Sequence, residues 1–250
     1  MISFLLILNS PQSQSNENLT KQVKKLKSDL EFLSASHLHG KFEPSILNDF
    51  ATVDSQFCFK PSYLLREVYE AFLKMAEAAK KDSIELKIIS ATRTFDSQKL
   101  IWENKWRGKV KIDGQKLTTT YKNTLRRAYK ILEYTAPPGF SRHHWGTEID
   151  LNAVEDEFFN TPEGEKMYSW LRIHAGEFGF CQTYTPKDLR NGLGFNEEKW
   201  HWSYSRIADS LQSEMVRTFQ KTMISDFLGF KEVRKINLLN DYILSIHTCQ

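Results

Sequence analysis

Residues 141–150 of the chain are SRHHWGTEID, and residues 198–204 are EKWHWSY. The two stretches carry imidazole and carboxylate side chains, which are the nitrogen and oxygen ligands that zinc takes from proteins. A catalytic zinc site uses three protein ligands and keeps its fourth position open for water. We therefore expect one metal site that both stretches build together, and hydrolysis is the reaction that such a site favours.

The spacing of the first stretch predicts a turn followed by a strand. His143 and Asp150 are seven residues apart, which is too far for neighbours on one helix face. The spacing suits a chain that turns at Gly146 and continues as the strand TEIDLN. Glycine adopts the positive φ of such a turn without a steric cost. A turn of this kind would bring the Asp150 carboxylate back toward the His143 ring.

The second stretch predicts an extended segment that supplies the third ligand. His201 lies between Trp200 and Trp202, and both indoles are expected on the opposite side of the segment because alternate strand residues face opposite ways. Glu198 precedes His201 by three residues, one short turn from the metal. A carboxylate there can accept a proton from the attacking water, a role that the ligand count does not require.

The residue pattern alone leaves two assignments open. His143 and His144 are adjacent, so spacing does not decide which of them binds the metal. Glu148 and Asp150 are two residues apart on the predicted strand and face the same side of it. Glu148 therefore either orients a metal ligand through a hydrogen bond or contacts the substrate.

These residues resemble the VanY-like D-alanyl-D-alanine carboxypeptidases, whose wider zinc-peptidase family shares its fold with the Hedgehog signalling domain and the lysostaphin-type peptidases. The family pattern is Ser-x-His, a Gly three residues on, an Asp four further, and later Glu-x-Trp-His. It falls here on Ser141, His143, Gly146, Asp150, Glu198, Trp200 and His201. The resemblance implies that His143, Asp150 and His201 hold zinc and that Glu198 is the general base. Glu148 is a departure, since many relatives carry a small apolar residue there.

The resemblance extends beyond the metal motifs. The segment SATRTFDSQ at residues 90–98 is similar to the family's Ser-x-x-Arg-Ser-x-x-x-Gln stretch, which places Arg93 and Gln98 in the cleft. A guanidinium can meet a substrate carboxylate, or the charge that develops on the attacked carbonyl oxygen, through forked hydrogen bonds. Removing Arg93 is therefore expected to damage turnover more than folding. Ser141 and Gln98 are expected as neutral donors to the same end of the substrate, with Tyr204 beside it.

Helical and strand patterns along the chain predict an α+β fold. Apolar residues recur at spacings of three and four in residues 61–82, which predicts a core-facing helix. The strand ELKIISA follows, and we expect further helices in SQKLIWENKW, in residues 117–134, in residues 161–180 and in residues 205–226. The tail INLLNDYILSI is apolar enough to dock on the body. The expected fold is a small, mainly antiparallel sheet that carries the zinc site, packed by helices on one face; the resemblance supplies its topology.

Composition fits one soluble catalytic domain. The chain has 250 residues, of which 40% are hydrophobic and 26% charged, as in ordinary globular proteins. Its 34 basic and 31 acidic residues give a net charge of +3, too balanced to indicate a nucleic-acid partner. We expect a monomer. Three cysteines allow at most one disulfide.

The N-terminal residues predict export. MISFLLILNS has an apolar run but lacks a basic start, so we expect residues 1–39 to be an atypical targeting and linker segment with a short helix. Residues 40–250 then form the zinc peptidase domain with a C-terminal helical extension. No apolar run reaches the length that spans a bilayer. We expect the protein in the cell envelope or periplasm, or secreted.

The sequence therefore predicts a zinc-dependent D-alanyl-D-alanine carboxypeptidase that hydrolyses the terminal peptide bond of peptidoglycan stem peptides. Four alternatives stay open. Three share the fold: a D,D-dipeptidase, an L,D-carboxypeptidase and an endolysin-like endopeptidase. The fourth is a non-catalytic wall-binding module that keeps its zinc for structure. His37 and His39 share a strand face in principle, but no further residues complete a metal site with them, so they are expected to be ordinary surface or core residues.

Overall fold

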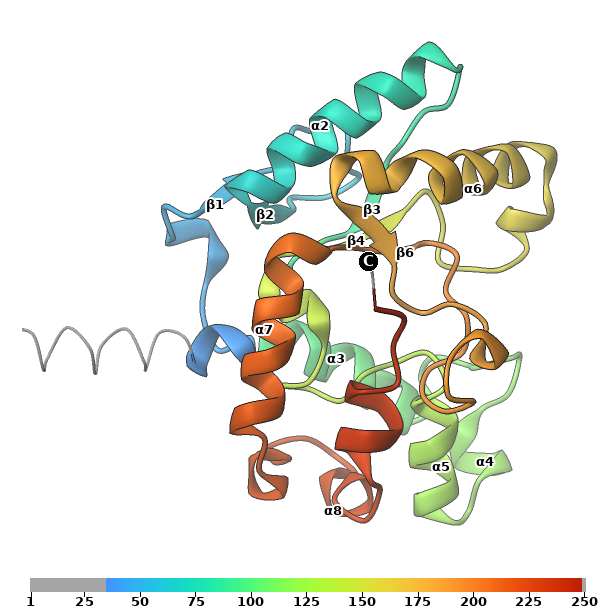
Figure 1. Cartoon of the computed structure of the whole chain (residues 1–250). Coiled ribbons are helices and arrows are strands. Elements are labelled where there is room, and N and C mark those ends of the chain that lie inside the picture. The colour runs from blue at the N-terminus through green and yellow to red at the C-terminus, as the bar shows by residue number, and fades with distance from the viewer. Residues whose placement is uncertain (1–34, 249–250) are drawn as a thin grey trace, which may run out of the picture.

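The computed structural model describes residues 35–248 (Figure 1). Its centre is a four-stranded antiparallel sheet in the order β3-β4-β6-β5. The strands are β3 (Ile88–Ser90), β4 (Glu148–Leu151), β6 (His201–Tyr204) and β5 (Phe180–Gln182). A separate hairpin pairs β1 (Phe50–Thr52) with β2 (Tyr63–Leu65). The expected α+β class with a small antiparallel sheet is confirmed.

Two helices cover one face of the sheet. α2 (Arg66–Lys81) and α6 (Pro162–His174) pack on strand residues that alternate toward them, such as Ile149 and Trp202. The α2 residues that face the sheet are Val68, Phe72, Met75 and Ala79, all fully buried at the predicted spacing. Alternation along β4 and β6 then turns Glu148, Asp150, His201 and Ser203 to the opposite face.

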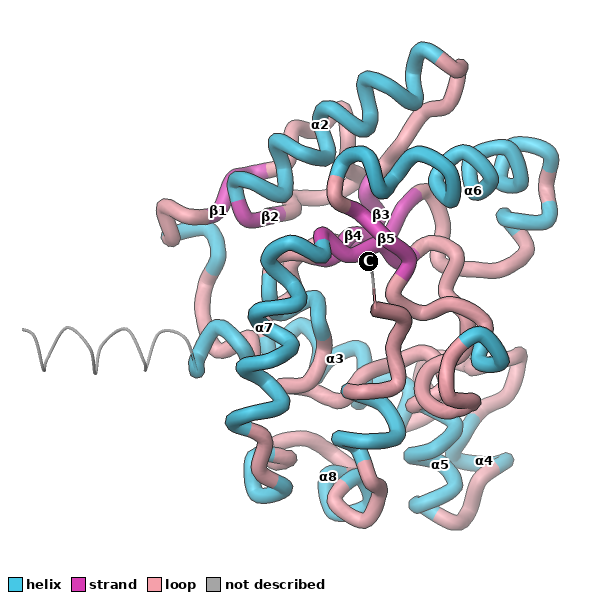
Figure 2. Tube along the Cα trace, viewed as in Figure 1, coloured by secondary structure: helices cyan, strands magenta, loops and turns pink. Residues whose placement is uncertain are grey.

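A second helical group lies on that opposite side, below the sheet in Figures 1 and 2. It comprises α3 (Phe95–Trp106), α4 (Leu117–Thr120), α5 (Thr124–Ile131), α7 (Ser205–Thr218) and α8 (Phe230–Val233). These helices share their own apolar core, which includes Trp102, Ile131 and Met215. Helices were expected on one face only, whereas the chain has a helical layer on each side of the sheet.

The C-terminal tail docks on the second core as predicted, through Ile236, Leu238, Tyr242 and Ile243. Short helical turns connect the larger elements: η1 (Pro44–Ile46), η2 (Arg142–Trp145), η3 (Phe158–Asn160), η4 (Ala175–Phe178), η5 (Lys187–Leu189), η6 (Lys221–Met223) and the π-helical η7 (Leu239–Ile243). Within residues 35–248, no helix is both long and apolar enough to cross a membrane.

Several predicted helices have different bounds in the structure. Those expected over residues 161–180 and 205–226 end earlier, at His174 and Thr218. The helix expected over residues 61–82 begins only at Arg66, because residues 63–65 pair with β1 instead. The helix expected over residues 117–134 is split into α4 and α5. The Asn123 side chain accepts a hydrogen bond from the Arg126 amide and thereby starts a new helix at Thr124.

Candidate metal centre and cleft

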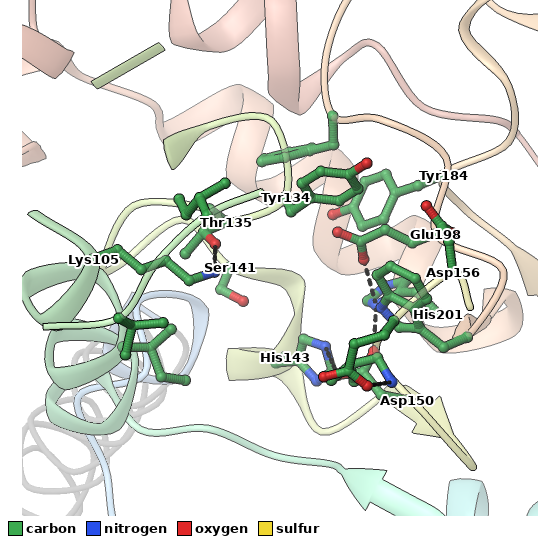
Figure 3. A pocket seen from close by; sticks show the side chains of 18 of the residues that line it. Lys105, Tyr134, Thr135, Ser141, His143, Asp150, Asp156, Tyr184, Glu198 and His201 are labelled. Atoms are coloured by element: carbon green, nitrogen blue, oxygen red, sulfur yellow. Dashed lines mark hydrogen bonds and ion pairs between the residues drawn. The ribbon is translucent and has the colours of Figure 1, made fainter. Parts of the chain in front are cut away.

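Three predicted ligands meet at one point on the face of the sheet opposite α2 and α6. Asp150 on β4 and His201 on β6 are direct partners in the strand pairing. His143 reaches them from η2, and one ligand atom of each residue lies within 4.8 Å of the others. All three side chains are buried (Figure 3). We call His143, Asp150 and His201 the ligand cluster.

The turn at Gly146 brings the loop and the strand together. Gly146 ends η2 with a φ of 77°, in the left-handed region that side chains other than glycine rarely adopt. A Cβ atom there would lie 2.7 Å from the Phe50 ring. Glycine is therefore required at this position for two reasons: the left-handed backbone conformation, and the close approach of Phe50 on β1.

Each histidine of the ligand cluster could offer one ring nitrogen to a metal ion. The Nδ1 of His143 donates to the Ala91 carbonyl oxygen at 2.8 Å, which leaves its Nε2 at 3.3 Å from Asp150. The Nε2 of His201 donates to Glu148 at 2.8 Å, which leaves its Nδ1 at 3.1 Å from Asp150. A carbonyl or carboxylate partner of this kind fixes the tautomer and orientation of a metal-binding histidine.

The geometry separates the two adjacent histidines. The Nδ1 of His144 donates to the Arg93 carbonyl oxygen at 2.7 Å, and its Nε2 accepts from the Gly139 amide at 3.0 Å. Both nitrogens are therefore occupied by backbone groups. Of these two adjacent histidines, only His143 has a ring nitrogen that faces Asp150 and His201.

Glu148 lies behind the ligands and not in the cleft. It is fully buried and accepts hydrogen bonds from Thr147, Ser203 and His201. Burial opposes its charge, but the Arg142 guanidinium at 3.2 Å and the His201 hydrogen bond lower the pKa of Glu148 to about 2. Of the two roles left open by the strand pattern, the structure favours support for His201.

A cleft of about 570 Å³ opens between the ligand cluster and α3. Arg93, Gln98, Ser141 and Glu198 all line it, together with the ligand cluster. Its volume is typical of sites for small ligands and peptide ends.

Glu198 faces the ligand cluster from the turn before β6. Its Oε2 lies 3.8 Å from the Nδ1 of His201, and its carbonyl oxygen accepts from the His201 amide at 3.2 Å. Burial raises the pKa of Glu198 to about 7. A buried carboxylate with a pKa near neutrality is suited to exchange protons with a water molecule.

Arg93 connects the ligand cluster to α3. Its Nη2 donates to Asp150 at 2.6 Å, its Nε donates to Ser90 at 2.7 Å, and its Nη1 donates to Gln98 at 3.2 Å. The Gln98 amide in turn donates to the Ala136 carbonyl oxygen at 2.7 Å. Arg93 thus orients Asp150, a role that the sequence did not indicate.

Comparison with known proteins fits this geometry. Residues 61–207 match the family model described as VanY: D-alanyl-D-alanine carboxypeptidase. The chain belongs to this VanY family. It is 29% identical over 177 residues to the protein YodJ of Bacillus subtilis (strain 168), which covers 67% of this chain and 56% of YodJ. It is 30% identical over 131 residues to a D-alanyl-D-alanine carboxypeptidase of Enterococcus faecalis, which covers 52% of this chain and 44% of the relative.

The chain therefore spans about half the length of the curated relatives it matches. Among solved structures, that of the LdcB LD-carboxypeptidase superposes with a TM-score of 0.50 at 24% identity, and covers 79% of this chain and 81% of LdcB. This likeness shows that the VanY-family chain has the same fold as LdcB.

One predicted site residue of this VanY-family chain lies elsewhere. Tyr204 is on β6, but strand alternation turns it away from His201 and into the core beside Phe180. Its hydroxyl donates to Glu67 at 2.9 Å. Tyr204 does not line the cleft, and we assign it no contact with substrate.

The VanY-family cleft also contains residues that the sequence motifs did not single out, namely Lys105, Thr135 and Tyr184. The Tyr184 ring packs on His201 with 4.6 Å between centroids. Helical spacing was a usable signal for Lys105, because positions 98, 101 and 105 share one face of α3. Thr135 and Tyr184 lie in irregular segments, where no such pattern exists.

Proposed function

We propose that this chain is a zinc-dependent carboxypeptidase that removes the terminal D-alanine from peptidoglycan stem peptides ending in D-alanyl-D-alanine. The convergence of the ligand cluster, Glu198 and Arg93 in one cleft is the observation that carries the proposal. Membership of the VanY family and the similarity to the Enterococcus faecalis carboxypeptidase support it.

The donor set fits a zinc ion. Two imidazoles and one carboxylate offer atoms within 4.8 Å of one another, and each imidazole has its second nitrogen fixed by a protein acceptor. Three ligands are the number that a catalytic zinc takes, whereas structural sites close all four positions. When bound, zinc would supply a Lewis acid and lower the pKa of a water molecule toward about 7. The three-ligand set argues against the non-catalytic module.

The surrounding residues then have distinct tasks. Glu198 accepts the proton of the attacking water and returns it to the leaving amine. Arg93 holds Asp150 and directs its remaining N–H groups at the carbonyl oxygen, on which negative charge develops. Gln98 positions Arg93 because its own amide is held by the Ala136 carbonyl oxygen. Ser141 lines the cleft and serves as a neutral donor to the substrate.

Product analysis tests the proposal. The full chain, loaded with zinc, is incubated with defined muropeptides, and the products are identified by mass spectrometry. We expect release of a single D-alanine from a pentapeptide stem, complete loss of release with a chelator, and recovery when zinc is added. Release of the intact dipeptide, of D-alanine from a tetrapeptide, or cleavage within cross-links would instead indicate one of the three same-fold activities.

The variant Glu198→Gln tests the mechanism. It keeps the shape of the side chain but cannot accept a proton at neutral pH. We expect D-alanine release to fall about 10²- to 10⁴-fold while one zinc per chain stays bound, as measured by elemental analysis. Glu197→Gln is the matched control, because Glu197 accepts from Tyr168 outside the cleft. Full turnover in Glu198→Gln would remove Glu198 from the reaction.

We propose a catalytic domain that begins earlier than residue 40. Leu38 is buried in the second core, and His37 and His39 hydrogen-bond to the carbonyl oxygens of Trp145 and Gly139. Both contacts brace the loop that carries His143, so these residues belong to the domain. The targeting and linker role expected for residues 1–39 then falls mainly on residues 1–34, outside the described part. An extracytoplasmic location and a monomeric state remain proposals, the first because the substrate lies in the cell wall.

A further inference from the structure

Lys105 is a cation inside the cleft that has no carboxylate partner. It lies in the last turn of α3, on the face shared with Gln98 and Ile101, and its side chain lines the cleft. Its ammonium donates to the Thr135 hydroxyl at 2.5 Å. None of the ion pairs among residues 35–248 involves Lys105; Asp150 pairs with Arg93, and Glu198 lies near His201.

Lys105 is half-buried, and its ammonium lines the cleft. Burial lowers the pKa of Lys105, while the negative charge of Glu198 across the cleft works in the opposite direction. A cation that is partly removed from water is stabilised more by an anionic partner than by a neutral hydroxyl. An anionic ligand in the cleft would satisfy Lys105.

Further donors surround the ammonium. Figure 3 shows Thr135 and Ser141 beside Lys105, on the side of the cleft opposite Glu198 and His201. The Ser141 side chain is buried and lines the cleft. We call Lys105, Thr135 and Ser141 the donor cluster. It combines one positive charge with two hydroxyls, which is suited to a carboxylate.

Arg93 has too few unused N–H groups to bind every anionic group of the substrate. A guanidinium has five N–H donors, and Arg93 commits three of them to Asp150, Ser90 and Gln98. The remaining two can meet one oxygen atom at the reacting carbonyl. A second anionic group of the substrate would need donors elsewhere in the cleft, where Lys105 and Lys111 supply positive charge.

We propose that Lys105 binds the C-terminal carboxylate of the peptide substrate, with Thr135 and Ser141 as neutral donors. The inference rests on the proposed function and deepens it. A free carboxylate one residue beyond the scissile bond exists only at a chain end. The donor cluster therefore selects for removal of a terminal residue and against cleavage within a chain.

Binding measurements test Lys105 independently of turnover. The full chain carrying Glu198→Gln and zinc is titrated by calorimetry with acetyl-D-alanyl-D-alanine and with the C-terminal amide of the same dipeptide. Adding Lys105→Met is expected to raise the Kd of the free acid about 10- to 100-fold, because a charge-assisted hydrogen bond is lost. The Kd of the amide should change less than about threefold. Lys105→Arg should recover most of the affinity for the acid.

Two further variants keep the test decisive. Lys109→Met removes an exposed positive charge just beyond α3 and outside the cleft, and should leave both Kd values unchanged. Thr135→Val retains the ammonium and should weaken binding of the acid about 2- to 10-fold, which answers the question if Lys105→Met does not fold. Equal losses for acid and amide, or no loss for either, would overturn the inference.

The outcome is separable from that of the proposed function. A chain that binds the free acid through Lys105 but releases no D-alanine would overturn the proposed function alone. If the chain releases D-alanine, but Lys105→Met changes the Kd of the acid and that of the amide by the same factor, only the role of Lys105 would be overturned.

Discussion

The ligand cluster and the donor cluster face each other across the same cleft, yet their polar atoms are satisfied to different degrees. In the ligand cluster, His143, Asp150 and His201 each have a protein partner that fixes their orientation. In the donor cluster, Lys105 has one neutral partner, the Thr135 hydroxyl, and no ion pair within the described residues. The ligand cluster therefore has its catalytic geometry before substrate binds, whereas the polar groups of the donor cluster gain their partners from the substrate.

Arg93 is the residue that joins the two sides, and its replacement should produce the largest effect. Arg93→Lys keeps a positive charge but cannot reach Asp150, Ser90 and Gln98 together. We expect kcat for D-alanine release to fall about 10²- to 10³-fold, because a donor to the developing oxyanion is lost. Steady-state kinetics measure this effect.

A control and a contrary result define the Arg93 test. Arg107→Lys alters the exposed end of α3, where Arg107 pairs with Glu103, and should leave kcat unchanged. A raised KM with an unchanged kcat would show that Arg93 contributes only to ground-state binding. Arg93 would then bind substrate, as the donor cluster does, and would not help to fix the catalytic geometry. The distinction between the two clusters would be wrong.

Glu148→Gln should loosen the ligand cluster from behind. The amide cannot hold the His201 Nε2–H group as the carboxylate does, so the ring nitrogen that faces the metal becomes less well oriented. We expect zinc affinity to fall about 10- to 100-fold, as measured by competition with a chromophoric chelator. Glu67→Gln on the opposite face of the sheet is the control. Unchanged affinity would mean that the cluster does not depend on this support.

His144→Gln should have the smallest effect and should act on stability. His144 joins the Gly139 amide to the Arg93 carbonyl oxygen and is fully buried. Loss of these contacts should lower the free energy of unfolding by about 1–3 kcal/mol, as measured by urea denaturation, while one zinc per chain remains bound. The half-exposed His174, which pairs with Glu177 outside the cleft, gives the control, His174→Gln. Loss of the metal would show that His144 is a ligand after all.

The sequence predicted what depends on local pattern. The turn at Gly146, the face of α2 and the shared face of Glu148 and Asp150 all follow from backbone preference and periodicity, and the structure contains each of them. The ligand cluster was accessible because its residues lie in two short motifs. Such information is local to the chain.

Contacts between distant segments were not accessible from the same patterns. Residues 63–65 have helical spacing with α2 but form a strand, because β1 offers them backbone partners. Tyr204 is a different case, because strand alternation, a local pattern, is enough to turn it to the face opposite His201. The donor cluster joins α3 to the loop before His143, and only the packing of the two segments reveals that Lys105 lacks a counter-ion.

Because Asp150 and His201 are direct partners in the strand pairing, changes in strand register and changes in loop length have different effects on the site. Strand alternation means that a shift of one residue would turn Ile149 and Trp202 toward the cleft and carry both ligands into the core. The chain between β4 and α6, in contrast, can lengthen or shorten without moving either ligand, provided that β4 and β6 still meet at the same residues. Insertions there would reshape the rim of the cleft and leave its chemistry in place.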